Sequence, residues 1–200
     1  MSLMSVFDIL GTIAFAVLGA LAGVEKKLDI LGILILALAT AVGGGILRDM
    51  LISNTPPVAF RNPLYVEVSI LSAFAAIWLR NLCKRFNMAI QVCDAIGLGS
   101  FAAAGANMAA SFGYYNVLTV VFLAVVTAVG GGVIRDVSIQ ELPAVFYKEI
   151  YATAALAGSL AFFFVYPYVA ADAAMYICFA VTTGLRLLAL RYHWDLPAIR

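Results

Sequence analysis

Charged residues are scarce in this chain of 200 residues. Asp, Glu, Lys and Arg make up 12% of it, whereas apolar residues make up 64%. Soluble domains carry about 25% charged and roughly 45–50% apolar residues, so this chain has too little polar surface to coat a globule in water. The net charge of +1 gives no basic field of the kind that attracts nucleic acid, and we expect no nucleic-acid partner.

The sequence also lacks the common motifs of enzymes and metal sites. It contains no His-Glu-x-x-His, no Gly-x-Ser-x-Gly and no Gly-x-x-x-x-Gly-Lys-Ser/Thr. Its three cysteines do not have the spacing of metal ligands. We therefore expect a protein that is not an enzyme and that has no bound cofactor or metal.

Long apolar stretches are what the sequence has in abundance. A membrane-spanning helix needs about 20 mostly apolar residues, and seven stretches reach that length. They predict an all-α integral membrane protein with one membrane domain over residues 1–200, in contact with membrane lipid. The seven stretches cover residues 3–24, 29–52, 63–83, 88–111, 115–138, 148–168 and 170–191.

Basic residues predict the orientation of these spans. If the N-terminus is outside, ten Lys and Arg residues fall on the inner side, against only Arg48 and Arg61 on the outer side. Because basic residues collect on the cytoplasmic side, we expect a multi-pass protein of the cell inner (plasma) membrane, N-terminus outside and C-terminus cytoplasmic. The ten residues are Lys26, Lys27, Arg80, Lys84, Arg85, Arg135, Lys148, Arg186, Arg191 and Arg200.

A segment of ten residues occurs twice, 87 residues apart. Residues 40–49 read Thr-Ala-Val-Gly-Gly-Gly-Ile-Leu-Arg-Asp, and residues 127–136 differ from them only by two swaps between aliphatic residues. Matching residues flank both copies in the same order. They include Asp8 with Asp94, Gly19 with Gly105, Pro57 with Pro143 and Tyr65 with Tyr151.

This duplication predicts inverted repeats. Each copy holds three predicted spans, and because three is odd the second copy must enter the membrane from the opposite side. Transport proteins often have this architecture, with the pathway at the repeat interface near the midplane. We expect repeat one at about 5–84, repeat two at about 88–168, and a seventh helix at about 170–191.

Each copy carries three consecutive glycines. A glycine inside a helix costs about 0.8–1.0 kcal/mol relative to alanine, so a triplet weakens a helix by roughly 2–3 kcal/mol. We predict a kink or a short unwound stretch whose carbonyls line an ion pathway. The alternative is close helix packing, which glycine permits. The residues are Gly43, Gly44 and Gly45 in the second span, and Gly130, Gly131 and Gly132 in the fifth.

An Arg-Asp pair follows each triplet, as Arg48-Asp49 and Arg135-Asp136. Ionisable residues inside spans are costly and usually face the bundle interior, so each pair is either a charged gate or a structural staple. Neighbouring residues on a helix point about 100° apart, so Arg48 need not pair with Asp49 and a partner on another helix is an alternative.

Two further aspartates, Asp8 and Asp94, open the first span of each repeat. A helix N-terminus favours an anion, so plain capping is one interpretation and a mouth of the pathway is the other. Asp29 aligns with the uncharged Asn116, and we therefore expect Asp29 to be a helix cap.

The repeated Thr-Ala-Val-Gly-Gly-Gly-x-x-Arg-Asp motif resembles that of the prokaryotic trimeric intracellular cation (TRIC) channels, a domain also catalogued as the bacterial glycine-transporter (UPF0126-type) family. The resemblance covers about residues 5–165. The residues that carry it upstream are Asp8, Gly11, Phe15, Ala16 and Gly19, and again Asp94, Gly97, Phe101, Ala102 and Gly105.

This resemblance implies seven helices, a homotrimer, and one cation pathway through each protomer at kinked second and fifth helices. It further implies a monovalent cation channel that carries mainly K⁺ and possibly Na⁺. The alternative function is secondary transport of a small amino acid such as glycine. A transporter of that kind couples to Na⁺ or H⁺, and the sequence has no Glu or His in mid-span that suggests proton coupling.

Overall fold

The structure is a computed structural model, and it describes residues 2–79, 87–146, 150–192 and 194. The predicted end of repeat one at residue 84 lies outside the described residues. So do five of the basic residues used to predict the orientation, which are Arg80, Lys84, Arg85, Lys148 and Arg200.

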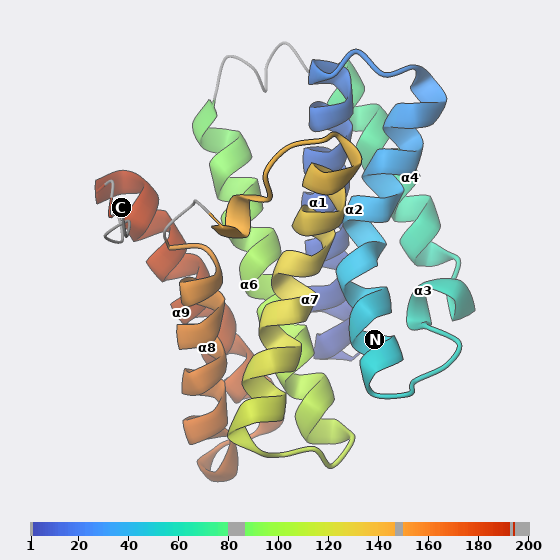
Figure 1. Ribbon diagram of the computed structural model, residues 1–200. Helices are drawn as coiled ribbons and strands as arrows, with labels where there is room; N and C mark the ends of the chain where they lie inside the picture. Colours follow the sequence, from blue (N-terminus) through green and yellow to red (C-terminus); the bar gives the residue numbers. More distant parts are fainter. Residues whose placement is uncertain (1, 80–86, 147–149, 193, 195–200) are drawn as a thin grey trace.

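The described residues are all-helical and contain no strand (Figure 1). Each predicted span contains an α-helix, although the helices in spans 63–83 and 148–168 are shorter than predicted, and the all-α class is confirmed. The α-helices are α1 (Leu3–Glu25), α2 (Ile30–Leu51), α3 (Val58–Arg61), α4 (Leu64–Trp78), α6 (Asn87–Ser111), α7 (Val117–Ser138), α8 (Ala152–Val165) and α9 (Ala171–Tyr192), and two short 3-10 helices are η1 (Ala144–Phe146) and η2 (Tyr166–Tyr168).

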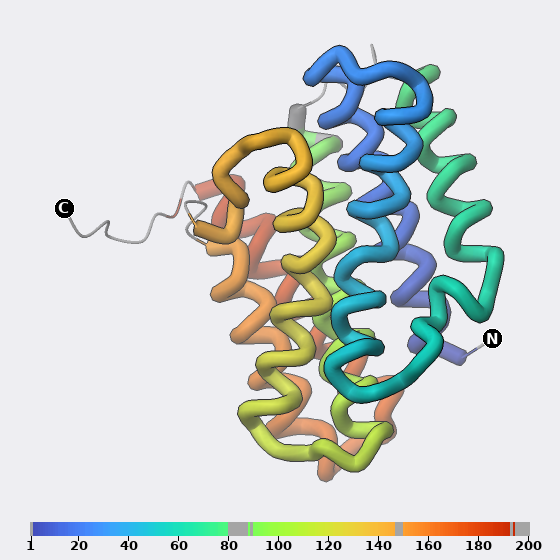
Figure 2. The backbone as a smooth tube through the Cα atoms, turned by 45° about the vertical axis from the view of Figure 1, so that its right-hand side comes forward, coloured from blue at the N-terminus to red at the C-terminus, as the bar shows by residue number. Residues whose placement is uncertain are grey.

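The helices form one bundle in which α1 and α6 run in opposite directions (Figure 1). We call the lower end of Figure 1 the Asp8 end, because α1 starts there. The upper end is the Asp94 end, where α6 starts and where α1, α7 and α9 finish. Figure 2 shows from a second direction that α2 and α7 lie side by side.

Helix caps explain why α2 and α7 begin where they do. The Asp29 side chain accepts a hydrogen bond from the Gly32 amide at 2.6 Å, and Asn116 accepts one from the Thr119 amide at 2.9 Å. The predicted cap at Asp29 is therefore confirmed. The capping interpretation of Asp8 is wrong, because Ser2 caps α1 and Asp8 lies buried inside the helix, beyond its first turn.

Glycines bring the duplicated helices into close contact at matching places. A Cβ at Gly19 would lie 2.8 Å from Ala37 Cα, and one at Gly105 would lie 2.8 Å from Ala124 Cα. At the crossing of α2 and α7, a methyl group at Gly44 would overlap the carbonyl oxygen of Thr127. The reciprocal overlap would occur between Gly131 and the carbonyl of Thr40.

The triplets do not unwind their helices. Both α2 and α7 run as single helices through residues 43–45 and 130–132, so the expectation of a short unwound stretch is wrong. The physical reason is the tight crossing, since close contact between two backbones compensates the low helical preference of glycine. A bend inside a continuous helix remains a prediction.

The outside of the bundle is apolar, as a membrane protein requires. By length and composition α1, α2, α7 and α9 can each cross a membrane, while Leu64–Trp78 and Ala152–Tyr168 are shorter apolar helices. Trp78 and Tyr168 are 85% exposed at opposite ends of the bundle, where amphipathic rings suit the membrane–water interface.

Candidate functional site

At the Asp8 end, one buried arginine joins two aspartates. Arg48, only 2% exposed, donates from Nη1 to Asp8 Oδ1 at 2.8 Å and from Nε to Asp49 Oδ1 at 3.0 Å. The second oxygen of Asp49 accepts the Val58 amide at 2.8 Å, which fastens the start of α3 to the end of α2. Arg48 thus pairs both with its neighbour and with another helix, α1.

At the Asp94 end, the matching Arg-Asp pair has the same local geometry. Arg135 donates from Nε to Asp136 Oδ1 at 2.8 Å, and Asp136 Oδ2 accepts the Ala144 amide at 2.9 Å. The duplicated sequence therefore builds the same unit twice, in which a helix-terminal Asp binds both its preceding Arg and the segment that follows the helix.

Asp94 is held by different partners from those of Asp8. Tyr151 donates its hydroxyl to Asp94 Oδ1 at 3.0 Å, and Arg186 Nη2 on α9 lies 3.7 Å from Asp94 Oδ2. Among the described side chains, no ion pair joins Arg135 to Asp94. The Arg48–Asp8 contact therefore has no equivalent between the described side chains of Arg135 and Asp94.

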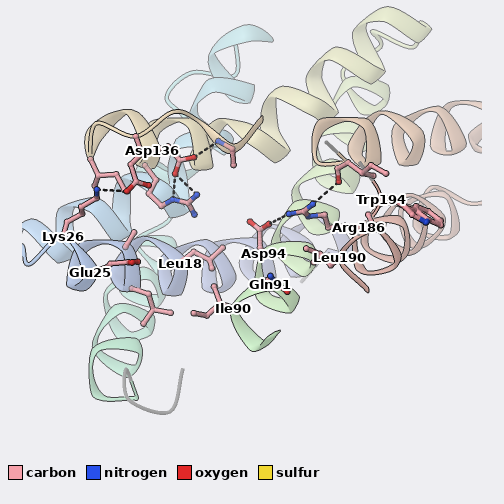
Figure 3. A pocket seen from close by; sticks show the side chains of 18 residues that line it. Leu18, Glu25, Lys26, Ile90, Gln91, Asp94, Asp136, Arg186, Leu190 and Trp194 are labelled. Carbon is pink, nitrogen blue, oxygen red and sulfur yellow. Dashed lines mark hydrogen bonds and ion pairs between the residues drawn. The ribbon is translucent and has the colours of Figure 1, made fainter. Parts of the chain in front are cut away.

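A cavity is lined by both Arg135 and Asp94, the two residues that lack this contact. It has a volume of about 480 Å³ and lies among α1, α6, α7 and α9 at the Asp94 end. Figure 3 shows Asp94 and Arg186 on one part of its wall and Asp136 on another. The equivalent space at the Asp8 end, lined by Asp8, Arg48 and Tyr65, measures only about 20 Å³.

Two aromatic rings meet in the middle of the bundle. Phe15 of α1 and Phe101 of α6 form an edge-to-face contact with ring centroids 5.1 Å apart, and both are buried. Phe101 lines the small cavity at the Asp8 end, while Phe15 packs near Gly131.

The third glycine of each triplet differs from the first two. A Cβ at Gly45 would meet only Arg48, at 3.9 Å, and a Cβ at Gly132 would meet only the Tyr151 hydroxyl, at 3.6 Å. These positions face the charged clusters, whereas Gly44 and Gly131 face the opposite helix. These contacts support the packing interpretation for the middle glycines, Gly44 and Gly131, while the third glycines lie beside the charged clusters.

The charged wall of the large cavity is mixed in sign. Its acidic residues are Glu25, Asp94, Asp136 and Glu141, and its basic residues are Lys26, Arg135 and Arg186. Among the described residues, no group of three His, Cys, Asp or Glu side chains could hold a metal ion. A cavity of about 480 Å³ with this charged wall has room for water and small charged solutes.

Sequence reasoning missed three members of these clusters. Tyr65 and Tyr151 had a usable signal, because they match each other between the two copies. Arg186 has no counterpart in the duplicated part, and the sequence placed it only among the basic residues on the inner side of the membrane. The structure instead buries it to 5% exposure inside the bundle.

These features define a class of protein: a multi-pass membrane protein built from two copies of one helical unit, with a polar cavity between them. The family model described as "Glycine transporter" matches this chain twice, at residues 5–81 and 91–167. The chain belongs to this family, the UPF0126 membrane proteins, and its fold is that of the TRIC channels.

Two curated relatives illustrate the membership. A UPF0126 membrane protein of Deinococcus radiodurans is 39% identical over 94% of this chain and 84% of its own length. The UPF0126 inner membrane protein YadS of Escherichia coli is 36% identical over 95% and 93%. This chain is thus a multi-pass inner membrane protein.

Three solved structures show the fold. A structure reported on the conductance of TRIC cation channels is 38% identical, covers 98% of this chain and 97% of its own, and has a TM-score of 0.91. A prokaryotic TRIC channel in 0.5 M KCl is 36% identical, with 96% and 98% covered and a TM-score of 0.89. The TRIC orthologue of Rhodobacter sphaeroides is 31% identical, with 97% and 100% covered and a TM-score of 0.90.

Proposed function

We propose that this chain is a monovalent cation channel, carrying mainly K⁺, with one pathway between the two repeats of each protomer. The observation that carries the proposal is the likeness to solved TRIC cation channels at 38% identity and a TM-score of 0.91. The pathway would run from the large cavity at the Asp94 end, past the Phe15–Phe101 pair, to the charged cluster at the Asp8 end.

The charges along this route fit a gated cation path. Asp94 and Asp136 line the open cavity and attract cations, while Arg135 and Arg186 are each already close to a carboxylate. At the Asp8 end, Arg48 occupies both carboxylates and fills the route. Under this proposal the Arg48–Asp8 contact is the closed gate, and Asp8 and Asp94 are the two mouths.

The assembly and the orientation belong to the same proposal. The solved relatives are named as trimeric channels, so we propose a homotrimer in which every protomer conducts. We also propose that the two copies are inverted across the membrane, with the seventh helix α9 outside the repeats. With the N-terminus outside, the large cavity opens to the cytoplasm, and the closed gate faces outward.

Potassium flux from liposomes tests the proposal. Purified protein in K⁺-loaded vesicles should generate an electrical potential in an outward K⁺ gradient without any organic solute. Because a channel needs no conformational cycle per ion, flux should greatly exceed that of a carrier. Vesicles with an equal amount of heat-denatured protein are the control. Flux at the level of protein-free vesicles would contradict the channel.

The second candidate is a carrier of a small amino acid. The family description and the shape of the cavity favour it, since one open end and one closed end also suit alternating access. In that case Arg135 would bind the carboxylate and Asp94 the ammonium group. Counterflow of labelled glycine, measured in the same vesicles without a K⁺ gradient, would favour the carrier and reject the channel.

A further inference from the structure

We propose that Arg186 is a positioning residue that keeps the large cavity open by pairing with Asp94 in place of Arg135. The inference rests on the proposed pathway and adds a role for α9, the helix outside the duplicated part. It starts from the difference between the two ends, where Arg48 contacts Asp8 directly and Arg135 leaves Asp94 to other partners.

Two further contacts help to place Arg186 beside Asp94, although its buried Nε has no hydrogen-bond partner among the described residues. Its Nη1 donates to the Ile150 carbonyl at 3.3 Å, and its guanidinium lies 5.1 Å from the centroid of the Tyr151 ring. The hydroxyl of that same tyrosine donates to Asp94. One turn of α9 away, Thr183 donates to the Ala95 carbonyl at 3.2 Å, which fastens α9 to α6 beside Asp94.

The partial burial of Asp94, whose side chain is 13% exposed, explains why a second cation matters. An aspartate inside a membrane protein needs a cation or several donors, because an unpaired buried charge is very costly. Arg186 supplies that cation from α9. Asp136 lies on another part of the cavity wall from Asp94 (Figure 3). Arg135 is therefore free to remain on Asp136, and the space between Arg135 and Asp94 stays open.

Arg135 has the reach to close this space if Arg186 is removed. Its counterpart Arg48 shows the geometry, with Nε on the adjacent Asp49 and Nη1 on Asp8 across to α1. Arg135 already has its Nε on the adjacent Asp136, so a further bond to Asp94 would reproduce the closed cluster. Loss of Arg186 removes the cation that competes with Arg135 for Asp94. It also removes a positive charge that lines the same cavity and repels Arg135.

The test measures access to the cavity and requires no ion flux. Leu21 lines the cavity, whereas Lys27 is exposed at the same end of the bundle outside it. Each position is changed to cysteine in turn, in a background whose native cysteines are replaced. The rate of reaction with a charged, membrane-impermeant thiol reagent is then measured in folded protein that elutes as the parent assembly.

Arg186→Gln should slow the labelling of Leu21→Cys at least about tenfold, because pairing of buried charges is strong enough to shift a two-state equilibrium by that amount. Labelling of Lys27→Cys should be unchanged. Adding Arg135→Gln to Arg186→Gln should restore the rate at position 21 to within about twofold, since the closing cation is then gone. Arg186→Lys, which keeps the charge, should give an intermediate rate.

The rescue separates positioning from a merely structural role. If Arg186 only supported the fold, removing a second cation would not restore access, and a slow rate in the double variant would overturn the proposal. A parental rate in folded Arg186→Gln would overturn it as well. If Arg186→Gln does not fold, Tyr151→Phe, which removes only the hydroxyl on Asp94, should also slow labelling, and an unchanged rate there rejects the proposal. If potassium flux is absent while the labelling pattern is as predicted, the proposed channel function is rejected and the positioning role of Arg186 stands.

Discussion

At the Asp8 end one arginine contacts two aspartates, while at the Asp94 end two arginines and a tyrosine share two aspartates. The Arg-Asp units themselves are alike, down to the backbone amide that each Asp accepts. The difference lies in the partners of the second carboxylate, Asp8 or Asp94, and it accompanies a change in cavity volume from about 20 to about 480 Å³.

This contrast shows how a duplicated sequence can give one closed and one open end. The repeated residues determine the two Arg-Asp units, and a residue outside the repeat decides which partner the second carboxylate, Asp8 or Asp94, takes. When two packings of the same unit differ in free energy by a few kcal/mol, a change in one interaction can shift the population from one to the other. The following predictions test the contrast between the two ends.

The largest effect should come from Arg48. Arg48→Gln leaves Asp8 and Asp49 buried without a cation, and loss of one partner of a buried pair typically costs about 3–5 kcal/mol. Arg135→Gln should cost less, because the Arg135 side chain is 15% exposed beside a cavity that water can enter. Thermal unfolding in detergent measures the loss of stability in both variants, and Arg61→Gln, at an exposed position, is the control.

Equal losses of stability in Arg48→Gln and Arg135→Gln would contradict the difference between the ends. The same pair of variants also reports on the gate. Only Arg48→Gln should increase the access of a thiol reagent to Thr12→Cys, since Thr12 lines the small cavity that Arg48 closes.

The middle glycines should give the next largest effect. Gly44→Ala or Gly131→Ala places a methyl group against a backbone carbonyl of the opposite helix, and overpacking of this kind costs about 1–3 kcal/mol. Gly45→Ala and Gly132→Ala are matched controls, because the added Cβ meets nothing closer than 3.6 Å. Thermal unfolding should separate the two pairs, and equal behaviour of all four variants would reject the packing role.

The sequence predicted much of the fold and part of the site. The length of the apolar stretches predicted the spans, as with 3–24 against the observed Leu3–Glu25, and the duplication alone related Arg48 to Arg135. The unwinding of α2 was predicted wrongly because intrinsic propensity cannot show that Thr127 lies against Gly44. Tertiary packing overrides that propensity.

The remaining features could not be predicted because they depend on contacts between distant segments. Nothing in the local sequence shows that Arg186 lies beside Asp94, because α9 has no copy to compare it with. The partner of Arg48 was equally open, since neighbouring positions on a helix point in different directions while a long side chain can span both. The structure shows that Arg48 reaches both Asp49 and Asp8.

The central ring pair should control flux with a smaller effect. Phe15→Leu removes the edge-to-face contact with Phe101 and widens the route. If the barrier falls by about 0.8 kcal/mol, the value for one methylene group, flux rises about fourfold. Potassium flux from liposomes measures this change. Phe7→Leu, also a buried phenylalanine of α1 but in contact with α9, is the control, and an equal rise there would refute the ring pair as a constriction.

The smallest effect should come from an ion pair at the surface of the Asp94 end. Lys26 Nζ lies 2.6 Å from Glu141 Oε1, and this pair links the two copies beside the cavity. Both side chains are substantially exposed, so the pair should contribute only about 0.2–1 kcal/mol. A double-mutant cycle of Lys26→Gln and Glu141→Gln in low and high salt measures it. Coupling that persists in high salt would contradict a solvent-exposed pair.

The most direct test of the central claim compares two matched positions, one at each end. Leu21 of α1 lines the large cavity, and Asn107 occupies the equivalent position of α6 at the Asp8 end. A charged, membrane-impermeant thiol reagent is applied in turn from each side of the membrane to single-cysteine variants at these positions. We predict fast reaction at position 21 from the cytoplasmic side only, and slow reaction at position 107 from either side. Equal rates at the two positions would contradict a pathway that is open at the Asp94 end and closed by Arg48 at the Asp8 end.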